Sequence, residues 1–226
     1  MRYDKGLKSE NVSYFYSPKK ESLATGTCLI LITPDSERTM CTYLGTAGKI
    51  NQNDINIDAI KASKITLLEG YLWDKGDPQK AFELALKNSN IKAMSLSDKF
   101  CVERHKENFM HLVNNHLDIV FANEQEITHL IDAHSIDEVI NFAKKLNKLI
   151  VVTRSEKGCL AIHKGQVFKC ESRKNLKLVD LTGAGDLFAA GFLNGYIKNK
   201  DILSCLEEGT NLASEVIQII GARLNN

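Results

Sequence analysis

The sequence lacks the features that would place the protein in a membrane, in a secretory pathway or on nucleic acid. Its longest apolar runs, such as 149–152, are far too short to span a bilayer. The first ten residues contain no apolar segment of the kind a secretory signal needs. A net charge of +1 gives no electrostatic reason to bind nucleic acid or an anionic membrane surface. We therefore expect a cytoplasmic protein that binds neither nucleic acid nor a membrane.

Cysteine and histidine patterns typical of disulfide frameworks and metal sites are also missing. The six cysteines form no C-x-x-C pair, and three of them lie within apolar segments: Cys28, Cys159 and Cys205. We expect scattered, buried thiols in a reducing compartment. The histidines form no H-E-x-x-H motif. The triplet His105, His111 and His116 has spacings of six and five, which do not stack on one helical face. We therefore expect no transition-metal site built by the protein.

Apolar and polar residues alternate in segments that predict an α/β domain. With 226 residues, 43% of them hydrophobic and only 3 prolines, the chain is long and apolar enough for one globular domain with a sizeable core. The pattern predicts strands at 12–16, 25–33, 38–44, 65–68, 91–96, 118–122 and 149–153, and a hairpin around Lys164-Gly165. Helices are predicted at 78–87, 102–116, 124–131, 136–146, 183–198 and 202–220.

Strands that alternate with helices favour a mainly parallel sheet covered on both faces. The pair 25–33 and 38–44 is different, because the turn at 34–37 joins the two strands directly and no helix accompanies them. We expect this hairpin to project from the sheet as a small lid.

The segment 182–186, Thr-Gly-Ala-Gly-Asp, leads directly into an apolar helix. Gly183 and Gly185 have no Cβ to block a ligand, and the start of the helix presents unpaired N–H groups and the positive end of its dipole. This combination predicts an anion site. Asp186 would repel an anion unless it has a chemical role. Accepting a proton from a hydroxyl group that attacks a bound phosphate is a role that fits.

Other interpretations of this turn fit the sequence less well. The chain contains no P-loop motif, and the segment 45–49 resembles one only in part. A dinucleotide-binding fingerprint would need glycine at position 188, where Phe188 stands. A purely structural alternative remains, in which the turn is a tight helix entry and Gly191 and Gly195 allow close helix packing.

The run DLTGAGDLFAAGF at 180–192 resembles the C-terminal signature of the PfkB/ribokinase family of sugar and nucleoside kinases. The resemblance implies a ribokinase-like three-layer α/β/α sandwich in one domain over 1–226, with lid strands within 11–45 and a nucleotide-binding core over 60–226. It also implies that the amides of Gly183, Ala184, Gly185 and Asp186 form an anion hole, that Asp186 is the catalytic base and that Thr182 contacts the nucleotide.

Asn123 and Glu126 follow a predicted strand in the pattern N-x-x-E. On the residues alone, this is a helix start of the capping-box type, worth about 1 kcal/mol without any further function. The family has an N-x-x-E motif at this place that organises Mg²⁺ and the phosphate charge through water. By resemblance the cofactors are therefore ATP and Mg²⁺, and a requirement for K⁺ stays open.

Three further positions are assigned roles by resemblance. Thr153 and Gly158 match the family's T-x-G-x-x-G segment along the ATP phosphates and ribose, although Ser155 replaces the first glycine. Asn211 resembles a position near the adenine ring, and its alternative is a polar residue on a helix face. Arg38 follows the lid turn and is a candidate substrate or anion contact, with a solvated turn arginine as the alternative.

The resemblance extends over nearly all of this chain, but members of the family usually begin with further strands and helices that have no match here. The Gly-Gly substrate motif and the sugar-binding aspartate of PfkB kinases have no match before residue 25. We therefore expect an N-terminally truncated version of the fold, most similar to adenosine-kinase-like members. Such a chain would need a separate N-terminal fragment, or a second copy of itself, to cover the sheet edge that is left open.

Two functions follow from these observations. The first is an ATP-dependent kinase that phosphorylates a hydroxymethyl group of a sugar or nucleoside, adenosine- or ribose-like. The second is a non-catalytic nucleotide-binding fragment or remnant that needs a separate N-terminal half.

Overall fold

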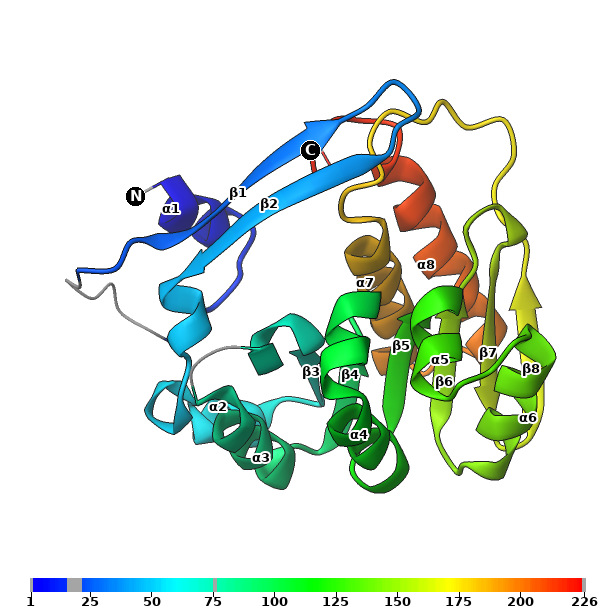
Figure 1. Cartoon of the computed structure of the whole chain (residues 1–226), viewed down its shortest axis with the longest axis horizontal. Coiled ribbons are helices and arrows are strands. Elements are labelled where there is room, and N and C mark those ends of the chain that lie inside the picture. Colours follow the sequence, from blue (N-terminus) through cyan, green and yellow to red (C-terminus); the bar gives the residue numbers. More distant parts are fainter. Residues whose placement is uncertain (1, 16–21, 75–76, 225–226) are drawn as a thin grey trace.

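A six-stranded sheet forms the centre of the molecule (Figure 1). The computed structural model describes residues 2–15, 22–74 and 77–224. The strand order is β3-β4-β5-β6-β7-β8, and the neighbours from β3 to β6 are parallel whereas β7 and β8 are antiparallel. The strands are β3 (Ile65–Glu69), β4 (Ile91–Ser95), β5 (Ile119–Asn123), β6 (Leu149–Thr153), β7 (Cys159–His163) and β8 (Gln166–Cys170).

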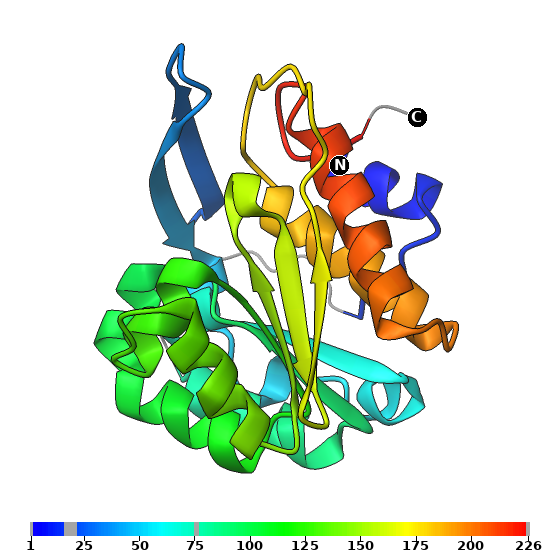
Figure 2. The same ribbon diagram turned by 90° about the vertical axis from the view of Figure 1, so that its right-hand side faces the viewer.

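Helices cover both faces of this sheet. One face carries α3 (Pro78–Asn88), α4 (Lys99–Asn115), α5 (Glu124–Leu130) and α6 (Ile136–Lys145), and the other carries α7 (Ala184–Ile197) and α8 (Ile202–Val216). Figure 2 shows the two helical layers on opposite sides of the strands. Alternate strand residues belong to separate cores, so Met94 and Val120 pack on the first side and Ala93 and Ile119 on the second. The predicted three-layer, mainly parallel architecture is confirmed.

Close contact between α7 and α8 depends on glycine. A Cβ on Gly191 would lie 2.7 Å from the carbonyl oxygen of Glu208, and one on Gly209 would lie 2.7 Å from that of Phe188. These contacts with backbone atoms cannot be relieved by a side-chain rotation, so the two helices pack at this distance only because both positions lack a side chain. The packing role predicted for Gly191 is therefore present in the structure.

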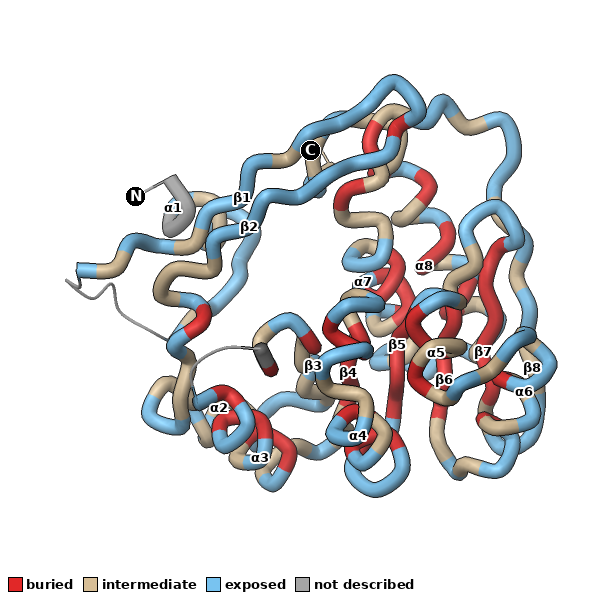
Figure 3. Tube along the Cα trace, viewed as in Figure 1, coloured by how far each residue is buried: buried red, intermediate tan, exposed pale blue. Residues whose placement is uncertain are grey.

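The hairpin forms a sheet of its own, as predicted. Strands β1 (Thr25–Ile32) and β2 (Arg38–Gly45) pair antiparallel, and neither joins the central sheet. Figure 3 shows the hairpin exposed along most of its length, whereas the central strands are buried. Leu29 is 62% exposed. Cys28 is exposed too, so the expectation of a buried thiol there was wrong, because this apolar strand has no core to pack against.

The two ends of the chain differ from the prediction. A helix, α1 (Arg2–Ser9), precedes the hairpin, and the described part of the predicted strand 12–16, residues 12–15, has no strand partner; residue 16 lies outside the described residues. Helix α8 ends at Val216, short of the predicted 220. The reason is that the carbonyl of Ile217 leaves the helix to accept hydrogen bonds from Val179 (2.9 Å) and Asp180 (3.3 Å).

The connection from the lid to β3 contains more regular structure than the loop that was expected. It contains short helical turns at Thr46–Lys49 and Gln52–Asp54 and the helix α2 (Ile57–Ala62). Each of the last two begins with a capping asparagine: the Asn51 side chain accepts from the N–H of Asn53, and the Asn56 side chain accepts from the N–H of Ala59. Such capping is local chemistry that can be recognised in a sequence. Among the described helices, none is long and apolar enough to cross a membrane.

Candidate active site

The predicted site residues gather where the parallel strands end. Asn123 closes β5 and Thr153 closes β6, and the two are paired in register. Glu69 ends β3. In open parallel sheets, ligands bind outside the carboxyl ends of the strands, because loops and helix starts converge there. The location alone makes this edge the candidate site.

The turn before α7 has the geometry that the anion-site prediction requires. Gly183 has a left-handed backbone (φ 81°, ψ 1°) and precedes the first helical residue, Ala184, without any side-chain cap. Within the described residues, the N–H groups of Gly183, Gly185 and Asp186 have no hydrogen-bond acceptor. A Cβ on Gly185 would meet nothing within 4 Å. The turn therefore presents unpaired donors beside open space.

The buried side chain of Asp180 supports this turn through hydrogen bonds. Only 1% exposed, it accepts hydrogen bonds from the N–H of Thr182 (2.8 Å) and of Gly221 (2.8 Å). Burial opposes ionisation, but the hydrogen bonds from Thr182 and Gly221 and the positive charge of Arg38 outweigh it, so the pKa of Asp180 lies below its usual value. The buried charge is thus one of the supports of the turn.

Arg38 lies at the start of β2, exposed, on the hairpin. Its charge stabilises the ionised form of Asp180, which lies two residues before Thr182. The first residue of the second lid strand is therefore within electrostatic reach of the candidate anion turn. Figure 1 shows the hairpin passing over the N-terminal end of α7. This proximity makes an anion contact possible for Arg38 and distinguishes it from a remote turn arginine.

Asp186 lies in the first turn of α7 with an exposed side chain. Its charge acts on Glu69 at the end of β3. Burial raises the pKa of Glu69, the hydrogen bond from Ser97 (Oγ to Oε2, 2.9 Å) opposes the rise, and the negative charge of Asp186 adds to it. Glu69 is a site residue that sequence reasoning missed. The available signal was an acidic residue at the last position of an apolar strand, followed by glycine.

Asn123 and Glu126 form the predicted capping box of α5. The side-chain oxygen of Asn123 accepts from the N–H of Glu126 (2.8 Å), and the carboxylate of Glu126 accepts from the backbone N–H (2.9 Å) and the side-chain amide (2.7 Å) of Asn123. Glu126 is 5% exposed. Burial raises the pKa of Glu126 to about 7, and the negative charges of Asp98 and Glu69 add to the rise. The hydrogen bond from Asn123 favours the ionised form and lowers the pKa in part. A nearby cation would relieve this cost.

No ready-made metal cage accompanies these carboxylates. Across the part of the chain that the structure describes, no group of three or more histidine, cysteine, aspartate or glutamate side chains is placed to hold an ion. A cation near Glu126 would therefore keep most of its water, which is how Mg²⁺ is usually bound.

The predicted nucleotide loop after β6 is a tight turn. The N–H of Arg154 donates to the carbonyl of Gly158 (2.8 Å), and Gly158 has a left-handed backbone (φ 79°). Ser155, which stands where the family has glycine, also has a positive φ of 50°. Arg154 forms a two-pronged ion pair with Glu124 (both 3.1 Å) at the start of α5. This pair connects the loop after β6 to the loop after β5.

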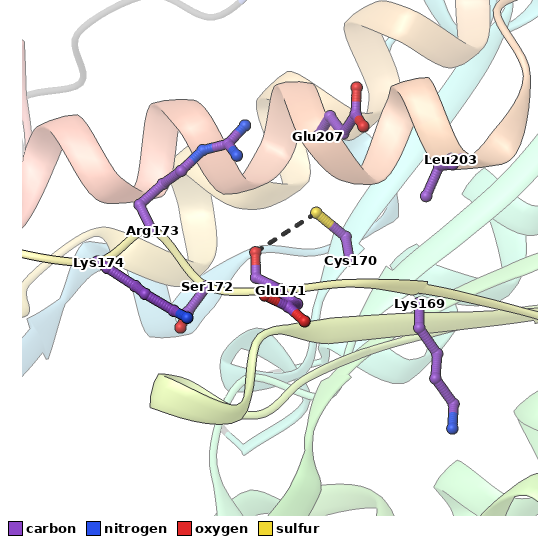
Figure 4. A pocket seen from close by; sticks show the side chains of 8 residues that line it. All are labelled: Lys169, Cys170, Glu171, Ser172, Arg173, Lys174, Leu203 and Glu207. Carbon is purple, nitrogen blue, oxygen red and sulfur yellow. Dashed lines mark hydrogen bonds between the residues drawn. The ribbon is translucent and has the colours of Figure 1, made fainter.

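Asn211 on α8 is engaged within the chain, because its side-chain oxygen accepts from the Nε–H of Arg173 (2.8 Å). Arg173 lines a cavity of about 530 Å³ between the end of β8 and α8 (Figure 4). The lining also includes Lys169, Cys170, Glu171, Ser172, Lys174, Leu203 and Glu207. None of the predicted nucleotide residues is among them. Arg173 therefore connects this cavity to Asn211.

Comparisons with known proteins agree with the motif. The family model of the pfkB family carbohydrate kinases matches residues 2–226. The chain is 28% identical to adenosine kinase 2 of Arabidopsis thaliana, over 98% of this chain and 68% of that protein. The structure of adenosine kinase from Sinorhizobium meliloti matches with a TM-score of 0.94 and 34% identity, over 98% of this chain and 69% of that one.

A more distant structure, the ribokinase of Thermotoga maritima, matches with a TM-score of 0.76 and 18% identity, which shows a shared fold alone. The fold is thus ribokinase-like. The chain spans about two thirds of the length of its Arabidopsis and Sinorhizobium relatives. Membership of a kinase family implies ATP and a divalent metal ion. On the match over residues 2–226, this chain belongs to the pfkB family of carbohydrate kinases.

Proposed function

We propose that the chain transfers a phosphoryl group from ATP to a hydroxymethyl group of a sugar or nucleoside, adenosine- or ribose-like. The observation that carries this proposal is the turn at 183–186, where the unpaired N–H groups of Gly183, Gly185 and Asp186 lie beside an exposed carboxylate. The N–H of Ala184 donates a long hydrogen bond to the carbonyl of Leu181 (3.4 Å) and would have to exchange it for the anion. Adenosine kinases among the relatives favour a nucleoside.

In this proposal the amides of Gly183, Ala184, Gly185 and Asp186 form the anion hole for the phosphoryl group in transit. The Asp186 carboxylate accepts the proton of the acceptor hydroxyl as its oxygen bonds to phosphorus and the bond to the leaving ADP breaks. Arg38 adds positive charge from the lid. The lid would also exclude water from the reacting groups.

We propose Mg²⁺ as the divalent ion, held through water near Asn123 and Glu126. The support is electrostatic, since Glu126 is buried with a raised pKa and lies in the field of Asp98 and Glu69. An ion held there would favour the charged form of the Glu126 carboxylate and would supply positive charge to the ATP phosphates. Whether K⁺ also activates is tested by replacing KCl with NaCl in the transfer assay.

Thr153, Gly158 and Thr182 are proposed to bind the nucleotide phosphates and ribose, and Asn211 to lie at the adenine. The Asn211 side-chain oxygen either gives up its hydrogen bond from Arg173 to bind the base, or keeps that bond while the Nδ2–H groups donate to the base. An Arg173→Ala variant separates these cases. In the first case it increases ATP affinity, because no partner competes for Asn211, and in the second it does not.

A second candidate, a nucleotide-binding chain without activity of its own, is favoured by one observation. In the part of the chain that the structure describes, β3 pairs only with β4, and Leu67 on β3 is 39% exposed. An unpaired parallel edge favours a further partner. We propose that a separate chain segment, or a second copy, covers this edge.

We also propose a cytoplasmic location, because all six cysteines are free thiols.

Titration with ATP and MgCl₂ by calorimetry, run beside a phosphoryl-transfer assay with adenosine and ribose, decides between the two. Binding with turnover supports the kinase. Binding without turnover selects the second candidate, and absence of ATP binding contradicts both.

A further inference from the structure

Two histidines face each other at the end of α4, just before β5, whereas Asn123 of the proposed site lies at the other end of that strand. His111 lies four residues before Asn115, the last residue of the helix, and His116 directly follows Asn115; both histidines are exposed. Their Nε2 atoms are 3.2 Å apart. The ring centroids are 5.1 Å apart, and the ring planes are inclined at 59°. The two rings therefore meet edge to edge through their nitrogens and are not stacked.

The sequence did not predict this pair, because a spacing of five places residues on different sides of a continuous helix. The helix is not continuous here. His116 leaves it with φ −121° and ψ −37°, while its N–H still donates to the carbonyl of Leu112 (2.9 Å). This departure turns the His116 ring back over the last turn and onto His111.

We propose that His111 and His116 form a two-histidine site for a divalent transition-metal ion of the zinc or nickel type. Zinc–nitrogen bonds are about 2.0–2.1 Å, so two of them at a tetrahedral angle place their nitrogens about 3.3–3.4 Å apart. The observed 3.2 Å needs almost no side-chain movement. Because the described residues supply no third His, Cys, Asp or Glu, water completes the coordination.

The contact with Asn115 favours the His111 tautomer whose Nδ1 is an acceptor. Its Nδ2 lies 3.1 Å from His111 Nδ1 and donates to the His111 carbonyl (3.0 Å). Without metal, Nδ1 therefore accepts, and Nε2–H donates to His116. A bound ion needs a bare Nε2, so the proton moves to Nδ1 and the facing Asn115 amide must turn to accept it. An aspartate at 115 would accept that proton directly.

The location separates this site from the proposed catalytic site. His116 leads into β5 through the segment before Ile119, whereas Asn123 ends the same strand at the opposite edge of the sheet. A metal at the histidine pair would join the last turn of α4 to the chain that enters β5. We therefore expect the metal to stabilise the fold without changing phosphoryl transfer.

The test is a calorimetric titration of the untagged protein with ZnCl₂ and with NiCl₂. His111→Gln and His116→Gln should each weaken binding by about tenfold or more, because a single histidine remains. The control His134→Gln removes another exposed histidine and should leave binding unchanged. Asn115→Asp should tighten binding by about tenfold. Equal affinities of the wild type, His111→Gln and His116→Gln would overturn the proposal.

Thermal unfolding provides a second readout. ZnCl₂ should raise the Tm of the wild type and of His134→Gln, because the folded state holds the two Nε2 atoms together and therefore binds the ion more tightly than the unfolded chain. It should not raise the Tm of His116→Gln. A Tm increase of the same size in His116→Gln would place the bound ion elsewhere and overturn the assignment.

Discussion

The N–H of Gly221 donates a hydrogen bond to the carboxylate of Asp180, 2.8 Å away and 41 residues earlier in the chain. The second oxygen of that carboxylate accepts from Thr182. One buried side chain thus joins the end of the chain to the start of the candidate anion turn. The neighbouring Ala222 also packs on Gly183, where a Cβ would come within 2.7 Å of its own.

Asp180→Asn should destabilise the protein. The side chain keeps its size but offers one uncharged acceptor oxygen in place of two charged ones. Either the Thr182 or the Gly221 N–H therefore loses its acceptor, and the other keeps only a neutral one. We expect a loss of about 1.5–3 kcal/mol in the free energy of unfolding, measured by urea denaturation. Asp201→Asn, at the exposed N-cap of α8, is the control and should cost well under half as much. Equal costs would mean that Asp180 does not support the turn.

Gly158→Ala and Gly165→Ala form a matched pair for the nucleotide loop. Both glycines have positive φ, 79° and 76°, so both substitutions carry the conformational cost of about 1–2 kcal/mol. Only at Gly158 would the new Cβ collide with backbone, 2.2 Å from the carbonyl oxygen of Cys170. We therefore expect Gly158→Ala to cost at least about 2 kcal/mol more in thermal unfolding. A similar cost for both would show that the loop can relax.

The strands of the sheet and their mainly parallel arrangement were largely predictable, because buried parallel strands such as β5 and β6 are unbroken apolar runs between helix patterns. The N-terminal region was not, since an aromatic alternation predicts a strand only if a partner strand exists, and residues 12–15 have none. The lid was recognised from its turn. The exposure of the lid could not be predicted, because an apolar strand pattern does not show which part of the protein the strand packs against.

The site was predictable in its local parts and not in its long-range contacts. The glycine turn and the capping box are short motifs whose geometry follows from neighbouring residues. The effect of Arg38 on Asp180 joins positions far apart in the chain and depends on where the lid lies. His111 and His116 were missed because the helix ends between them.

Glu126 should make stability depend on pH. Its pKa in the folded protein is about 7, above the ordinary value of 4.5, so the folded state keeps a proton that the unfolded state has lost. Stability should therefore fall as pH rises from about 4.5 to 7, by roughly 2–3 kcal/mol. Glu126→Gln removes most of this decline, and the part due to Glu69, whose pKa is also raised, remains.

Urea denaturation at pH 5 and pH 8 measures the effect. The control is Glu215→Gln, an exposed position on α8, which should keep the wild-type slope. A Glu126→Gln variant whose stability falls with pH as steeply as that of the wild type would contradict a raised pKa at Glu126.

Gly185→Ala separates binding from folding at the anion turn. In the protein without ligand, the new Cβ meets nothing within 4 Å and lies in a helical turn, so stability should stay equal or rise by about 0.5–1 kcal/mol. The same methyl group should block the approach of phosphate to the amides. We expect weaker ATP binding by calorimetry together with an unchanged or higher Tm. Unchanged ATP affinity would show that phosphate binds elsewhere.

The most direct test of Asp186 as the proton acceptor is to measure kcat for Asp186→Asn, together with the Kd for ATP in the presence of Mg²⁺. Asp186 is exposed beside the unpaired amides, so the substitution removes the proton acceptor and leaves those donors in place. We predict that kcat falls by about 10²–10⁴ while the Kd stays within about threefold. A variant that phosphorylates adenosine or ribose at the wild-type rate would contradict it.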